Sequence, residues 1–186
     1  MRKVFEKAPL AAFRRDANLQ DILIHSKHRK SFAKGKDGTQ KCGRNCVMCK
    51  HMAEDITHRS LDGKEYTFKD KVNCKTSNII YGIKCDHCGK IVYVGETGTS
   101  IYERFQNHLS SIRRMKDDPV ANHFQEGEHM LRDVKIIGIE KMKTRDIHFR
   151  KVRESFWIQK LKTLTPQGLN QNLGIGDGTR GITHNV

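Results

Sequence analysis

The run of residues 78–94 constrains the fold of this chain more than any other part of it. Two apolar stretches rich in β-branched and aromatic side chains, 78–84 and 90–94, flank a short polar turn from Cys85 to Gly89. Two such stretches joined by turn residues are typical of a β-hairpin. The sequence therefore predicts an antiparallel pair of strands with two cysteines in its turn.

An amphipathic helix is expected directly after this hairpin. Thr97 and Gly98 are expected to end the second strand, and Ser100 can act as the N-cap of a helix. Four apolar residues then recur at helical spacing: Ile101, Phe105, Leu109 and Ile112. Arg104 and His108 are four residues apart, so this helix presents a cation and an imidazole on one face.

Similar periodicities predict further strands and helices. Residues 57–68 contain an Asp62-Gly63 turn beside alternating apolar residues, which indicates a small hairpin. Residues 134–139 read as a strand, and a helix is expected from Arg145 or Asp146 to Leu161. Its apolar side should comprise Phe149, Val152, Phe156 and residues 158–161. Together these elements predict an α/β (α+β) fold with a small three-stranded, mainly antiparallel sheet flanked by helices.

A strongly basic composition indicates a polyanionic partner. The 186 residues carry a formal net charge of +14, on a chain long enough for one or at most two small domains. No apolar run is long enough to span a bilayer, no signal-peptide core follows the first residues, and the most basic segments lack a clear amphipathic helix. We therefore expect a soluble, intracellular protein that binds nucleic acid and no membrane.

Three of the six cysteines lie close together: Cys42, Cys46 and Cys49. In an intracellular chain this spacing favours a metal site over disulfides. A structural zinc site needs four ligands, and Cys74, just before the first strand, is the preferred fourth. His51 and His58 are the alternatives. The expected result is a zinc knuckle pinned onto the hairpin domain.

The other two cysteines, Cys85 and Cys88, need two more ligands to hold a second zinc ion. The segment just beyond the first helix offers His123 and His129, with a gap slightly longer than in the usual zinc-finger pair. His87, between the two cysteines, is expected to be exposed. The remaining histidines that we considered are expected to be ordinary surface or core residues: His25, His28, His148 and His184.

Several of these residues stand in the order of a known nuclease family. The residues concerned are Ile79-Ile80-Tyr81, Tyr93-Val94-Gly95, Arg104, His108, Glu154 and Asn170. In this order the chain resembles the GIY-YIG nucleases. With a cysteine pair between the two tyrosine motifs, it looks most like the endonuclease domain at the C-terminus of Penelope-like retroelement polyproteins, over roughly residues 40–173. The set of two cysteines and two histidines matches the zinc site of the Penelope-type nucleases.

The chain departs from this family's pattern at two positions. Ile79 stands where the first motif usually has glycine, and a strand interior does not require glycine. Glu96 follows the second motif where many family members carry lysine. The second departure argues against a mechanism in which a lysine at that position activates a tyrosine.

The resemblance implies a catalytic site of six residues: Tyr81, Tyr93, Arg104, His108, Glu154 and Asn170. Cleavage of a phosphodiester needs an activated water, stabilisation of transition-state charge and help for the leaving 3′ oxygen. Glu154 is the expected ligand of Mg²⁺ (or Mn²⁺), and Arg104 is a permanent cation suited to phosphate. His108, Tyr81 and Tyr93 are alternatives for the group that activates water, and the late asparagine would orient the end of the site.

The expected function is a DNA endonuclease that nicks target DNA and leaves a 3′ hydroxyl from which a linked reverse transcriptase primes. The resemblance implies two structural Zn²⁺ ions, an upstream reverse transcriptase domain in the same polyprotein, element RNA as a further partner and a nuclear location. The alternative is a non-catalytic zinc-finger module that binds DNA or RNA on a nuclease scaffold. A zinc interaction domain of the ubiquitin-ligase type is disfavoured by the charge and the ligand spacing.

Four segments are expected along the chain. Residues 1–41 are basic and poor in apolar side chains, so they read as a connector to an upstream polymerase part or as a disordered leader. Residues 42–77 would form the four-cysteine zinc module, residues 78–173 the nuclease domain and residues 174–186 a flexible tail. Five basic residues are candidates for phosphate contacts: Arg29, Lys30, Arg113, Arg114 and Lys116.

Overall fold

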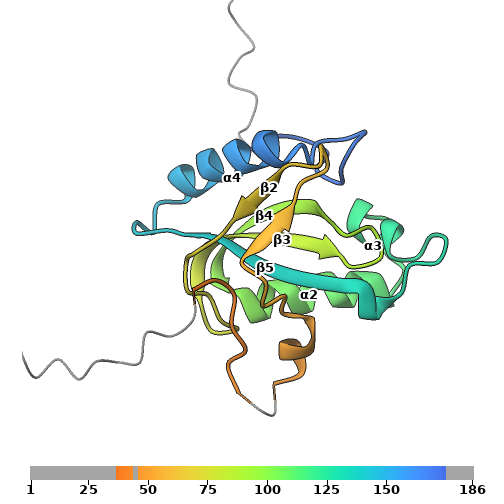
Figure 1. The fold of residues 1–186 in the computed structure, drawn as a ribbon, viewed down its shortest axis with the longest axis horizontal. Coiled ribbons are helices and arrows are strands. Elements are labelled where there is room, and N and C mark those ends of the chain that lie inside the picture. The colour runs from red at the N-terminus through yellow and green to blue at the C-terminus, as the bar shows by residue number, and fades with distance from the viewer. Residues whose placement is uncertain (1–36, 44–45, 175–186) are drawn as a thin grey trace, which may run out of the picture. The chain divides into compact units, whose positions relative to one another are not determined.

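The computed structural model describes residues 37–43 and 46–174 of the chain. Within these ranges the chain forms a central sheet, a small separate hairpin and several helices (Figure 1). In chain order the elements are η1 (Val47–His51), β1 (Thr57–Arg59), β2 (Glu65–Thr67), β3 (Ser77–Cys85), β4 (Lys90–Ser100), α2 (Ile101–Arg113), α3 (Pro119–His123), η2 (Leu131–Asp133), β5 (Val134–Lys141) and α4 (Ile147–Leu161), where η denotes a 3₁₀ helix.

The central sheet has the strand order β4-β3-β5, and both pairings are antiparallel. β3 is therefore the middle strand and β4 is one edge. Tyr81 of β3 lies opposite Gly95 of β4, so the two tyrosine motifs are neighbours in the sheet. This α/β architecture, with an antiparallel three-stranded sheet flanked by helices, confirms the predicted fold class.

Alternating residues of β3 face two separate cores. Ile79, Tyr81 and Ile83 pack in the core that includes the apolar face of α2, whereas Ile80 packs in the core that includes Ile158 of α4. Successive side chains of a strand point to opposite faces of the sheet. The sheet therefore lies between α2 and α4, which Figure 1 shows on its two sides.

The predicted features of α2 are confirmed. Its four apolar residues are all buried. The hydroxyl oxygen of Ser100 accepts a hydrogen bond from the amide of Glu103 at 3.2 Å, so Ser100 is the N-cap. The hairpin and the helix follow each other without a loop because β4 ends at this cap.

The small hairpin of β1 and β2 also forms as predicted, within residues 57–68. It rests on the C-terminal end of α4. The hydroxyl of Tyr66 donates to the carbonyl of Lys160 at 3.2 Å, and the amide of Leu61 donates to the carbonyl of Leu161 at 3.4 Å. The hairpin therefore satisfies carbonyl groups that the end of a helix leaves free.

β4 is longer than predicted, because it continues through Thr97 and Gly98. Thr97 pairs with Ile79 of β3, and this pairing keeps the segment extended although glycine is a weak strand former. A Cβ atom on Gly98 would lie 3.0 Å from a nitrogen of the Arg150 guanidinium. The glycine therefore permits a close approach of α4 and does not end the strand.

The buried face of α4 differs from the prediction. Phe149, Val152 and Phe156 are exposed, and the buried residues are Arg150, Ser155, Ile158 and Leu161. Arg150 is buried because its guanidinium binds the carboxylate of Glu96 at 2.7 Å. The ring of Phe156 is only partly exposed to solvent. The charged groups of Arg153 and Lys160 pack against it, 4.4 and 5.1 Å from its centroid.

Some predictions fall on parts of the chain that the structure does not describe. Arg29, Lys30, most of the segment 1–41 and nearly all of the segment 174–186 lie outside the described residues. Within the described ranges, no helix is long and apolar enough to cross a membrane.

Candidate functional site

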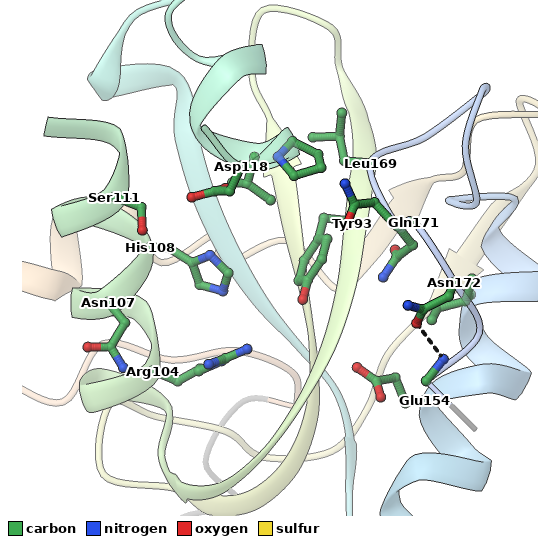
Figure 2. Close-up of a pocket in the computed structure, with 15 residues that line it drawn as sticks. Tyr93, Arg104, Asn107, His108, Ser111, Asp118, Glu154, Leu169, Gln171 and Asn172 are labelled. Carbon is green, nitrogen blue, oxygen red and sulfur yellow. Dashed lines mark hydrogen bonds between the residues drawn. The ribbon is translucent and has the colours of Figure 1, made fainter. Parts of the chain in front are cut away.

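A polar cavity opens beside the edge strand β4, between the two helix layers. Its volume is about 360 Å³. Figure 2 shows Arg104 and His108 on α2 at one side, Glu154 on α4 at the other and Tyr93 between them. Asn170, in the loop after α4, also lines the cavity. The structure therefore brings together five of the six residues that the sequence singled out.

The sixth, Tyr81, lies behind the cavity and is fully buried. The Arg104 side chain donates from Nε to the Tyr81 hydroxyl oxygen at 2.9 Å, and the same hydroxyl lies 2.8 Å from Nε2 of His108. The Tyr81 hydroxyl therefore joins the side chains of Arg104 and His108 in one hydrogen-bonded group. A Cβ atom on Gly95 would lie 2.6 Å from this hydroxyl, so the glycine of the second motif makes room for it.

The protonation states of these groups follow from their burial. Burial raises the pKa of Tyr81 well above its ordinary value, and Tyr93 adds to this rise. Burial also raises the pKa of Tyr93, although the positive charge of Arg104 opposes the rise. Burial, together with the positive charge of Arg104, lowers the pKa of His108 to about 4. At neutral pH both tyrosines are therefore protonated and His108 is neutral.

The low pKa of His108 should make the folded protein sensitive to acid. Unfolded histidine has a pKa near 6.5, so between about pH 6.5 and pH 4 the unfolded chain binds the extra proton and stability falls as pH falls. We expect wild type to lose about 2 kcal/mol more than His108→Gln between roughly pH 7.5 and pH 5, measured by urea unfolding at matched zinc content. His148→Gln, at an exposed histidine, is the control. Equal losses in wild type and His108→Gln would contradict the assignment.

Glu154 is the carboxylate that faces Arg104 across the cavity. Burial, together with the nearby Glu96 carboxylate, raises the pKa of Glu154 to about 7. The amide of Glu96 donates to Oε1 of Glu154 at 3.1 Å. Within the described part of the chain Oε2 has no hydrogen-bond partner, and a Cβ atom on Gly174 would lie 2.6 Å from it. A single carboxylate oxygen is therefore left for a ligand in the cavity.

Sequence reasoning did not predict the buried ion pair behind this carboxylate. Arg150 donates to the carboxylate of Glu96 at 2.7 Å and to the side-chain oxygen of Asn78 at 3.0 Å. Glu96 itself does not line the cavity. Arg150 and Glu154 are one helical turn apart and share a face of α4, but no local pattern links Arg150 to Glu96. Glu96 stands at the position where the resemblance implies lysine, and its negative charge is thus neutralised by Arg150 of α4.

Asn170 binds the backbone of the edge strand. Its side-chain oxygen accepts from the amide of Val94 at 3.0 Å, and its side-chain nitrogen donates to the carbonyl of Val94 at 2.8 Å. The preceding residue, Leu169, donates its amide to the carbonyl of Val92 at 3.0 Å. The loop after α4 is therefore fixed along β4 beside Tyr93.

The cavity also has lining residues that sequence reasoning missed. Besides the predicted residues, its polar lining comprises Asn107, Ser111, Asp118, Gln171 and Asn172. Two of them could have been found, because Asn107 and Ser111 share a helical face with Arg104 at spacings of three and seven residues. The loop residues carry no comparable periodic signal.

The four cysteines of the first predicted zinc site lie together. The Sγ–Sγ distances are 3.6 Å between Cys42 and Cys49, 3.5 Å between Cys46 and Cys74 and 3.6 Å between Cys49 and Cys74. A disulfide would need about 2.05 Å, whereas a tetrahedral zinc ion with Zn–S bonds of about 2.3 Å needs sulfurs about 3.8 Å apart. The four thiols therefore fit zinc.

The alternative fourth ligands for this site lie elsewhere. Neither His51 nor His58 belongs to the group of cysteines. Nδ1 of His51 donates instead to the carbonyl of Val134 at 2.8 Å. His58 stacks on Phe68, with ring centroids 5.9 Å apart.

The second predicted group also comes together, with the ligand atoms of Cys85, Cys88, His123 and His129 all within 4.8 Å of one another. Sγ of Cys88 lies 3.8 Å from Nε2 of His123 and 3.3 Å from Nε2 of His129. Nδ1 of His129 donates to the carbonyl of Glu126 at 2.8 Å, which leaves Nε2 free to bind a metal ion. This group too can hold zinc. His87 is exposed, as predicted.

The two cysteine clusters stand at opposite ends of α2. At the N-terminal end, the carbonyl of Cys74 accepts from the amide of Tyr102 at 3.1 Å. At the C-terminal end, the segment between the two histidine ligands contributes Gln125, whose side chain donates to the carbonyl of Ile112 at 3.2 Å. The helix that carries Arg104 and His108 is thus held by both groups.

Three of the predicted phosphate contacts lie at the end of α2. Arg113, Arg114 and Lys116 are exposed, and none of them forms a salt bridge within the described residues. They leave a positively charged surface beside Ser111, which lines the cavity.

Comparison with known proteins gives one match. A family model of the GIY-YIG catalytic domain matches residues 77–170, which is half of the chain. The match begins at β3 and ends at Asn170. It therefore contains every residue predicted for the catalytic site. No curated protein and no solved structure matches the chain.

Proposed function

The chain belongs to the GIY-YIG family, and from this premise we propose that it is a divalent-metal-dependent DNA endonuclease. Membership of this nuclease family supports nuclease activity and DNA as the partner. The observation that carries the proposal is the pairing of Arg104 and Glu154 across one cavity, with Tyr93 between them. A cation and a metal-binding carboxylate on opposite walls suit a phosphodiester group.

Each residue of the cavity has a role that follows from its contacts. Arg104 stays charged at any reaction pH and binds the phosphate oxygens. The Tyr81 hydroxyl holds the Arg104 side chain in place by a hydrogen bond, and His108 in turn holds this hydroxyl. Tyr93 lines the cavity, so it is placed to act as the general base once it has lost its own proton to solvent, and the charge of Arg104 favours this tyrosinate. The tyrosinate would orient the attacking water and accept its proton, which returns Tyr93 to the neutral form.

The donor set at Glu154 fits a hard divalent cation. Mg²⁺ and Mn²⁺ prefer oxygen ligands, and Mg²⁺ usually keeps several waters beside one or two carboxylates. Glu154 would hold the ion through its free carboxylate oxygen, near the side chains of Gln171 and Asn172. When bound, the ion would supply positive charge that stabilises the transition state and the leaving 3′ oxygen.

The two cysteine clusters would hold structural zinc. Each offers four protein ligands, which leaves no open position for substrate. Neither cluster includes a residue that lines the catalytic cavity. We therefore assign catalysis to the Glu154 cavity and stabilisation of α2 to the zinc sites.

The finer part of the proposal concerns the context of the nuclease. The cysteine pair between the two tyrosine motifs supports a nuclease of the Penelope-like retroelement type. In that context the protein would act in the nucleus beside a reverse transcriptase domain of the same polyprotein, with element RNA as a further partner. It would nick target DNA so that the 3′ hydroxyl primes reverse transcription.

Metal-dependent nicking of supercoiled plasmid tests the function. We expect zinc-loaded wild type to convert supercoiled plasmid to open circles in Mg²⁺ or Mn²⁺, and to stop when EDTA removes the ion. Zinc content and circular dichroism, measured after brief EDTA treatment, control for loss of structure. Activity should return when Mg²⁺ is added again.

Two other results of the same assay would change the conclusion. A folded, zinc-loaded protein that binds DNA without cutting it would favour the non-catalytic binding module, once the polymerase part had also been supplied. Cutting that persists in EDTA at full rate would rule out the metal site at Glu154.

A further inference from the structure

Met115 projects from the end of α2 into solvent. Its side chain is 78 % exposed, the highest value among the large apolar side chains in the described part of the chain. Moving a methionine side chain from water into an apolar environment lowers the free energy. A side chain of this kind at a protruding turn is therefore a candidate for burial in a partner.

The backbone at Met115 is also unusual for its residue type. Its φ of +50° lies in the left-handed region, which glycine adopts most readily. The amide of Met115 donates to the carbonyl of Ile112 at 3.2 Å, and the amide of Lys116 donates to the carbonyl of Ser111 at 3.0 Å. These two bonds form a Schellman motif, in which Met115 occupies the position usually held by glycine. The chain thus carries a large apolar side chain where a smaller residue would be more stable.

The surroundings of Met115 are positively charged. Arg113, Arg114 and Lys116 flank it and are exposed. The two acidic residues that follow are engaged elsewhere: Asp117 accepts from the side chain of Asn122 at 3.0 Å, and Asp118 accepts from a backbone amide of α3 at 2.9 Å. Three cations around one protruding methionine are complementary to a polyanion that also offers an apolar interior.

We propose that Met115 is a wedge that inserts between base pairs of the DNA substrate, while Arg113, Arg114 and Lys116 bind the adjacent phosphates. Proteins that kink DNA often insert an apolar side chain between two base pairs from the minor groove. The kink would bend the duplex so that a phosphodiester further along it enters the cavity. This inference rests on the proposed function only in that it takes DNA as the ligand.

The position of the wedge agrees with this role. Along α2, Met115 follows Arg104 by about 16 Å at a rise of about 1.5 Å per residue. That length corresponds to roughly five base-pair steps of about 3.4 Å. Ser111, one turn before Met115, lines the cavity, so a duplex that contacts the wedge runs along the face of α2 that leads to Arg104.

Binding to kinked DNA tests the wedge without any need for cleavage. In a Glu154→Gln background, we compare a plain duplex with one that carries a central bulge, using fluorescence anisotropy and energy transfer between the duplex ends. The bulge removes the cost of unstacking. The Glu154→Gln protein, which keeps Met115, should bind the bulged duplex about tenfold or more tightly than the plain duplex. It should also bend the plain duplex. Met115→Gly should lose both properties, and Met115→Leu should retain them.

The glycine variant cannot lose these properties through misfolding, because it should be more stable. Glycine adopts the left-handed backbone conformation without strain, so the melting temperature of Met115→Gly should be about 2–4 °C higher than that of the protein with Met115. Lys162 is an exposed, left-handed residue at the end of α4, and Lys162→Gly is the matched control. It should gain similar stability and keep the preference for the bulge.

Unchanged bending and bulge preference in Met115→Gly would overturn the wedge. Failure of all variants to bind DNA would overturn both the wedge and the proposed nuclease. A preserved bulge preference in a protein that never cuts plasmid would support the wedge and count against the nuclease alone.

Discussion

Replacing Glu154 by glutamine is expected to lower the rate of DNA cleavage by about a thousandfold or more at saturating Mg²⁺. Glu154 is the carboxylate that faces Arg104, and Glu96 is bound to Arg150 instead. Glutamine keeps the shape and can still accept the hydrogen bond from the Glu96 amide. The loss should therefore reflect the missing charge and metal ligand. Rates of plasmid nicking over a range of Mg²⁺ and Mn²⁺ concentrations measure it.

The control for this variant is Glu103→Gln. Glu103 is an exposed carboxylate in the first turn of α2 and does not line the cavity. It should cut at close to the wild-type rate. Glu154→Gln should also keep the wild-type melting temperature, because burial already disfavours its negative charge. Cleavage by Glu154→Gln within about tenfold of wild type would remove Glu154 from the catalytic site.

Replacing Cys74 by alanine should have the largest effect on stability. It should reduce the zinc content from two ions per chain to one, since two ligand groups are present and only one is damaged. Structural zinc contributes about 10 kcal/mol or more in small zinc modules, so even a partial loss should lower the melting temperature by more than about 10 °C. Zinc release measured with a chelating dye, and thermal unfolding by circular dichroism, test this.

Activity should fall in the same variant although no zinc ligand lines the cavity. The carbonyl of Cys74 accepts from the amide of Tyr102, so an unfixed Cys74 turn loosens the start of the helix that carries Arg104. Cys88→Ala, in the second group, offers the matched comparison at the other end of α2. A Cys74→Ala protein that retains two zinc ions would show that another residue is the fourth ligand.

The local structure near the tyrosine motifs could be predicted because its signals are periodic. The apolar run in 78–84 reflects a strand that is buried on both faces, the helical spacing from Ile101 to Ile112 reflects one buried face, and the structure has both. The spacing of the cysteines likewise limited which residues could complete each zinc site. Such patterns depend on near neighbours in the chain, which a sequence displays directly.

The roles of individual side chains depended on contacts that no local pattern contains. Tyr81 and Tyr93 occupy similar motifs, yet only Tyr93 lines the cavity. This difference arises because one lies on the middle strand and the other on the edge. The buried face of α4 was wrongly predicted for a similar reason, since the burial of Arg150 depends on Glu96, which is distant in sequence. A prediction from apolar periodicity does not take an ion pair such as Arg150 and Glu96 into account.

The amide side chain of Asn170 has a consequence for how β4 behaves in solution. An edge strand normally exposes a row of unpaired amides and carbonyls that can recruit a strand from another chain, which is a route to aggregation. Asn170 occupies both backbone groups of Val94, and Leu169 occupies the carbonyl of Val92. The side chain thus mimics one residue of a further strand. It closes this part of the β4 edge to self-association while leaving the neighbouring Tyr93 open to a substrate.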